Sequence, residues 1–108
     1  MIRIREYVGE DGFSPFGGWF ERLPSPASEK VTVALYRMGS GNLSNAKGVG
    51  SGVSEFRIDF GPGYRVYFGR DGETLIILLG GGSKQRQNRD IQQAIECWTA
   101  YRKKKKVK

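Results

Sequence analysis

Apolar and polar residues alternate over several short segments of the chain, a pattern that predicts β-strands. The alternation covers residues 2–8, 53–60 and 64–68. Residues 75–79 are apolar throughout, which predicts a central strand buried on both faces. The three glycines at 80–82 are expected to end that strand.

Between the first two of these strands, apolar residues recur at helical spacing. Ser14 and Pro15 predict the start of a short helix that ends at Pro24. A second Ser-Pro pair at residues 25 and 26 predicts another helix, which ends near Gly39 or Gly41. Two helices joined so closely form a helical hairpin.

The rest of the chain completes the expected order of elements. The glycine- and serine-rich segment 39–52 predicts a flexible surface loop, and Ser83 is expected to cap a last helix that runs to about Tyr101. The order β-α-α-β-β-β-α predicts an α+β domain with a small, mostly antiparallel sheet, a helical hairpin and a C-terminal helix. We expect one domain over residues 1–101 and a basic tail over 102–108.

Composition excludes several classes of protein. The chain has 108 residues, 38% of them hydrophobic, enough for one core, and no stretch has the roughly 18–20 apolar residues that span a bilayer. It contains no histidine, which excludes Ser-His and Cys-His nucleophile pairs and His-containing zinc sites. The single Cys97 lies in the expected last helix and is interpreted as packing. We expect a cytoplasmic protein with no membrane association, no metal and no cofactor.

The net charge of +7 suggests a polyanionic partner, but its distribution is uneven. Without the tail 102–108 the remaining chain carries only +1. The tail is therefore either a nucleic-acid contact or a solvated, frayed end. Its expected phosphate-binding residues are Arg102, Lys103, Lys104, Lys105 and Lys106.

The most informative segment is EFRIDFGPGYRVYF, residues 55–68. If its apolar residues face the helices, Arg57, Arg65 and Tyr67 share the opposite, open face of neighbouring strands. Two guanidinium groups, whose planar forks match phosphate oxygens, then form a candidate phosphate site. The alternative is that Glu55 and Asp59 simply pair with the arginines on a solvated sheet face.

A second group of cations follows the glycines. Gly80-Gly81-Gly82-Ser83-Lys84 resembles a phosphate-cradling loop but lacks the spacing of a nucleotide-binding P-loop. Lys84 at a helix start, beside two arginines, is suited to proton transfer. Arg86 and Arg89 add positive charge and are expected to bind RNA phosphates. The alternative is an ordinary solvated helix face.

The string GVSEFRIDFGPGYRVYF, followed by an apolar strand, a glycine-rich exit and Lys84, resembles the RelE/ParE-like toxin superfamily. The likeness is strongest to its addiction-module killer proteins, the HigB-like branch, and covers residues 2 to about 101. It implies a small toxin of a type II toxin-antitoxin module, neutralised by a cognate antitoxin, here expected to be a helix-turn-helix protein.

The resemblance also implies an activity and site residues. RelE- and HigB-like relatives cleave messenger RNA on the ribosome without a metal. Arg65 matches the arginine that contacts the scissile phosphate, Arg57 a basic strand position, and Lys84 a basic position after the glycine-rich exit. Two positions depart from the family: Gln85 stands where a second arginine is expected, and Ile91 near the usual helix tyrosine, for which Tyr67 is the candidate substitute.

Three functions remain open at this point. The first is a metal-independent endoribonuclease that arrests translation, with Arg57, Arg65, Lys84 and Tyr67 as catalytic residues. The second is a ParE-like toxin that binds DNA gyrase and catalyses nothing. The third is an inactive toxin-fold protein that only binds an antitoxin.

Overall fold

A computed structural model describes residues 1–106 of the chain. Three α-helices and five strands follow one another as β1 (Arg3–Glu6), α1 (Pro15–Glu21), α2 (Ser25–Gly39), β2 (Ala46–Gly50), β3 (Val53–Ile58), β4 (Tyr64–Arg70), β5 (Leu75–Ser83) and α3 (Gln87–Lys106). A single 3₁₀ turn, Lys84–Arg86, joins β5 to α3. The predicted α+β class is confirmed.

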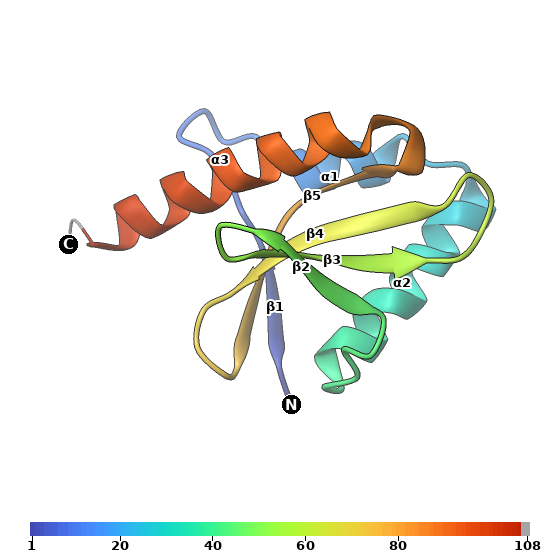
Figure 1. Cartoon of the computed structure of the whole chain (residues 1–108), viewed down its shortest axis with the longest axis horizontal. Coiled ribbons are helices and arrows are strands. Elements are labelled where there is room, and N and C mark those ends of the chain that lie inside the picture. The colour runs from blue at the N-terminus through green and yellow to red at the C-terminus, as the bar shows by residue number, and fades with distance from the viewer. Residues whose placement is uncertain (107–108) are drawn as a thin grey trace.

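The five strands form one mixed sheet in the order β1-β5-β4-β3-β2 (Figure 1). Three neighbouring pairs are antiparallel, and β1 pairs with β5 in parallel, so the sheet is mostly antiparallel as predicted. β5 lies between β1 and β4, and its residues Ile76 to Leu79 are at most 2% exposed. The prediction of a central strand buried on both faces is confirmed.

Helices cover both faces of the sheet, and each face has its own apolar core. On one face, Phe16 of α1 and Val31 and Met38 of α2 pack on Phe56 and Phe68. The α1–α2 hairpin stands on this face as predicted, and the Ser14 hydroxyl caps α1 by accepting a hydrogen bond from the Gly17 N–H at 2.9 Å.

On the other face, α3 lies across the sheet and forms a second core. Its residues Ala94 and Trp98 pack on Val53, Tyr67 and Ile77. This face was predicted to be open and solvated, and that prediction is wrong over the part that α3 covers. The residues on this face of β3 and β4 are of polar types, so the sequence does not indicate that α3 buries them.

Two element boundaries also differ from the predictions. Residues 39–52 are not all loop, because β2 pairs with β3 across a tight turn in which Ser51 and Gly52 both have positive φ. The glycines at 80–82 do not end the central strand, which continues to Ser83 and pairs with β4 along that length.

The last helix is longer than predicted and includes most of the tail. α3 continues to Lys106, so residues 102–106 are helical rather than frayed. Residues 107–108 of the predicted tail lie outside the described residues. Within residues 1–106 no helix is both long and apolar enough to cross a membrane.

Candidate functional site

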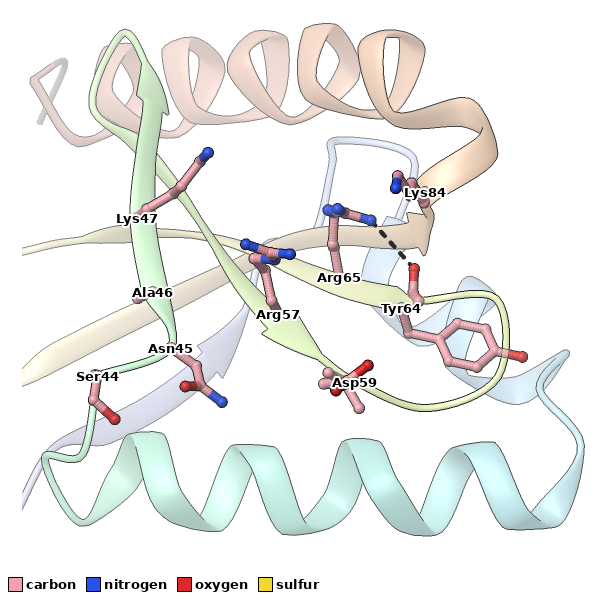
Figure 2. A pocket seen from close by; sticks show the side chains of 11 residues that line it. Ser44, Asn45, Ala46, Lys47, Arg57, Asp59, Tyr64, Arg65 and Lys84 are labelled. Atoms are coloured by element: carbon pink, nitrogen blue, oxygen red, sulfur yellow. Dashed lines mark hydrogen bonds between the residues drawn. The ribbon is translucent and has the colours of Figure 1, made fainter.

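A cavity of about 640 Å³ opens on the sheet face beside α3, next to the part that the helix covers. The cations that line it come from β2, β3, β4 and the turn after β5. In Figure 2 they lie around one space: Lys47, Arg57, Arg65 and Lys84. Asp59 is the carboxylate in the lining. The site is therefore strongly cationic although the body of the chain is nearly neutral.

Arg57 and Arg65 lie directly opposite each other on β3 and β4. Like charges at opposed positions of an antiparallel pair destabilise a sheet. The turn of residues 61–63 fixes this register, so the repulsion is built into the hairpin. A bound anion between the two guanidinium groups would relieve the repulsion, which is the behaviour expected of a phosphate site.

Arg65 is unusual because its charge is buried. Its side chain is 7% exposed and its Nε lies 3.4 Å from the Glu55 Oε1, an ion pair without hydrogen-bond geometry. The same Glu55 oxygen accepts a hydrogen bond from the Gln87 Nε2 at 3.2 Å, and an Arg65 NH group donates to the Gly63 carbonyl at 3.3 Å. The Gly63 carbonyl and Glu55 thus hold Arg65 in place, and Gln87 in turn holds Glu55.

The other cations of the cavity are exposed. Arg57, Lys47 and Lys84 all have solvent-exposed side chains. The Lys84 backbone N–H donates to the Gly63 carbonyl at 2.9 Å, which fixes the start of the 3₁₀ turn beside β4. The cavity therefore combines one rigid, buried guanidinium with three adjustable cations, an arrangement suited to gripping a flexible polyanion.

Tyr67 shares the sheet face of Arg65 but does not line the cavity. It is 0% exposed under α3, and its hydroxyl has no hydrogen-bond partner among the described residues. Burial first, and then the nearby carboxylates of Glu55 and Asp90, raise the pKa of Tyr67 to about 12. The prediction that Tyr67 lies on an open face beside the arginines is wrong, because α3 packs over it.

No model of a known protein family matches the chain. A protein of Haemophilus influenzae (strain ATCC 51907 / DSM 11121 / KW20 / Rd), described as an uncharacterized protein, is 41% identical to it over 80 residues. These residues make up 73% of this chain and 81% of that protein. The chain belongs to the family of this Haemophilus protein. The description of this relative names no activity.

The remaining predicted phosphate-binding residues of this family member lie outside the cavity. Arg86 and Arg89 are exposed around the start of α3, near Lys84. The cations of the C-terminal turns are also exposed: Arg102, Lys103, Lys104, Lys105 and Lys106.

One member of this C-terminal group has a partner. The Lys105 Nζ lies 2.6 Å from the Asp71 Oδ2, and the Tyr101 hydroxyl donates to the same carboxylate at 2.6 Å. These bonds tie the end of α3 to the β4–β5 hairpin and lower the pKa of Asp71, first through Lys105 and then through Tyr101. The tail is therefore partly a structural contact rather than wholly a ligand-binding arm.

Sequence reasoning missed the residues that β2 contributes. Ala46 and Lys47 of β2 line the cavity, as do Ser44 and Asn45 just before the strand. The sequence feature that could have indicated β2 is the Ser51-Gly52 pair. In the structure both residues have positive φ, as a tight two-residue hairpin turn requires. Five glycines over residues 39–52 concealed it, because glycine is poor in strands.

Proposed function

We propose that the chain is the toxin of a type II toxin-antitoxin module, with a RelE-like fold and a metal-independent endoribonuclease activity on ribosome-bound messenger RNA. Such a toxin acts in the cytoplasm and is held inactive by a cognate antitoxin. The observation that carries the proposal is the gathering of Arg57, Arg65 and Lys84 around one cavity. The family resemblance implied these three residues, and they come from three different elements of the structure.

The chemistry of RNA cleavage fits these side chains. The ribose 2′-hydroxyl gives its proton to a ribosomal group or to water, and its oxygen attacks the adjacent phosphorus. The bond to the 5′-oxygen breaks, and the products carry a 2′,3′-cyclic phosphate and a 5′-hydroxyl. Arg57 and Arg65 would stabilise the charge that develops on the phosphorane oxygens. Lys84 would donate a proton to the departing 5′-oxygen.

The rest of the site limits what the chain does alone. Glu55 is buried and engaged with Arg65, so we assign it to positioning rather than to proton transfer. Tyr67 is inaccessible, and the chain has no histidine to take the proton from the 2′-hydroxyl. The proposal therefore includes help from the ribosome in orienting and activating the RNA, and it implies poor cleavage of naked RNA.

Induced expression in growing cells tests this function. Wild-type protein should stop incorporation of labelled methionine before incorporation of labelled thymidine. Arg57→Ala should abolish the arrest, because Arg57 is an exposed cavity residue whose loss leaves the cores intact. Arg37→Ala, an exposed arginine at the end of α2, is the matched control and should remain toxic.

The same experiment separates the alternatives. If incorporation of thymidine stops first, the gyrase-binding function replaces the proposal. If wild-type protein accumulates in folded form without any arrest, the chain is an inactive toxin-fold protein.

A further inference from the structure

The last part of β5 has a free edge. β1 pairs with β5 only as far as Leu78, where the Tyr7 N–H donates to the Leu78 carbonyl at 2.9 Å. Beyond that point β5 runs on to Ser83 with β4 on one side. Among residues 1–106, no strand or backbone group pairs with the other side of residues 79–83. Alternate residues of this segment therefore direct N–H and C=O groups into an unpaired edge.

This edge lies at the bottom of a groove rather than on a flat surface. A cavity of about 500 Å³ runs along Leu79 to Ser83, separate from the basic cavity except for the shared Tyr64. Pro15, Trp19 and Arg22 of the α1 region form one wall, and Arg86, Asp90 and Gln93 form the other. In Figure 1 the end of β5 passes close to both α1 and α3.

The glycines of the edge are explained by how closely both walls approach. A Cβ on Gly81 would overlap the Trp19 indole, and a Cβ on Gly82 would overlap the Asp90 carboxylate. The two helices therefore press on opposite faces of β5 and leave its edge open between them. Natural sheets usually cover or charge such an edge, because it pairs readily with another chain.

We propose that this edge binds an extended, acidic segment of a partner protein by strand addition. A strand of about five residues, roughly 17 Å long, would pair with residues 79–83. This inference does not depend on the proposed nuclease activity, because the groove and the basic cavity are distinct.

The walls of the groove give the chemistry of the partner. Alternate side chains of an added strand would face the α1 wall and the α3 wall. The α1 wall offers Trp19 and the 54% exposed Phe13, which suit an apolar side chain. Each wall also carries an exposed arginine, Arg22 or Arg86, so an acidic side chain on either face meets a cation.

Asp90 is the carboxylate of the groove, and it has no ion pair or hydrogen bond with any side chain of residues 1–106. Its pKa is raised by burial, while Arg86 and Arg89 oppose that rise. The Asp90 carboxylate oxygens are therefore free to accept a hydrogen bond from a ligand in the groove. The added strand can supply an N–H or hydroxyl donor at this position, which completes the groove.

A peptide selection tests the proposal. A displayed library of short random peptides is selected on the full-length protein, and the enriched peptides are synthesised and titrated. We expect peptides in which acidic and apolar residues alternate. Methylation of the backbone nitrogens in one alternate register should weaken binding about tenfold or more, since each lost hydrogen bond contributes about 1 kcal/mol. Methylation in the other register, which faces away from β5, should leave Kd within about twofold.

Two further measurements locate the site. Arg22→Glu should weaken binding severalfold, whereas Lys104→Glu, an equal charge change on an exposed residue outside the groove, should not. Amide hydrogen exchange should slow at residues 80–83 when the peptide binds. The proposal is overturned if no peptide is enriched, if both methylation registers behave alike, if Lys104→Glu acts as strongly as Arg22→Glu, or if the protection appears on β2 instead.

Discussion

The buried ion pair between Glu55 and Arg65 is the most demanding feature of the site, and Glu55→Gln tests it. Glu55 is 1% exposed, and the Arg65 side chain is 7% exposed. Glutamine keeps the shape but leaves the guanidinium without its counter-charge. Breaking a buried ion pair by removing one partner destabilises a protein by about 3–5 kcal/mol.

The expected effect here lies below that range, because the guanidinium retains the Gly63 carbonyl as an acceptor and borders the cavity. We expect Glu55→Gln to lower the free energy of unfolding by about 2–3 kcal/mol. Urea denaturation followed by tryptophan fluorescence measures this change, provided that the m-value stays constant. Asp59→Asn removes an exposed carboxylate from the same cavity and should shift stability by no more than about 0.5 kcal/mol.

A double-mutant cycle isolates the pair. Arg65→Met alone strands Glu55 in the core, so it should also destabilise the fold. The double variant should be less destabilised than the sum of the two single variants, by about 1 kcal/mol or more. If Glu55→Gln is as stable as the wild type and the two changes add, the pair does not hold Arg65 in place.

Three further outcomes follow from the structure. Phe56→Ala should destabilise the fold by about 3–5 kcal/mol, because Phe56 is 2% exposed under α2; an unchanged thermal melt would mean that the faces of β3 are inverted. Tyr67→Phe should keep stability or raise it by about 1 kcal/mol, since it removes a buried hydroxyl without a partner; a clear loss of stability in urea would indicate a hidden bond. The pKa of Asp71 is lowered by its bonds to α3, so these bonds stabilise the helix end at every pH above the ordinary carboxyl pKa near 4. The stabilisation is lost as the pH falls through the lowered pKa of Asp71. Chemical shifts of residues 101–106 should report that loss in the wild type, whereas Asp71→Asn should show it at every pH.

The period-two pattern predicted the core under the α1–α2 hairpin. Phe56, Val66 and Phe68 lie on the predicted face. The prediction succeeds here because the residues on the buried face are apolar, so the alternation of residue types follows the alternation of burial. The same reasoning gave a wrong prediction for the opposite face of the sheet. Glu55 and Arg65 are charged residues in buried positions, and a single sequence does not reveal that α3 lies over them.

The site was partly predictable. Residue types and the family resemblance selected Arg57, Arg65 and Lys84, and the structure places all three on one cavity. The extension of β5 was not predictable, because glycine normally weakens a strand, and only the close approach of Trp19 and Asp90 explains the glycines there.

We propose ribosome-dependent RNA cleavage at the basic cavity, and a reconstituted reaction tests this activity. Purified protein is added to a defined messenger RNA, either free in solution or bound to ribosomes, and the RNA ends are mapped. Arg57→Ala is the test variant because Arg57 is exposed, whereas substitution of the buried Arg65 would also disturb Glu55. We expect cleavage on the ribosome that leaves 2′,3′-cyclic phosphate ends, and little cleavage of naked RNA. Arg57→Ala should lose the cleavage, and Arg37→Ala should keep it in full. Intact messenger RNA with the folded wild-type protein, or equal cleavage by Arg57→Ala, would contradict it.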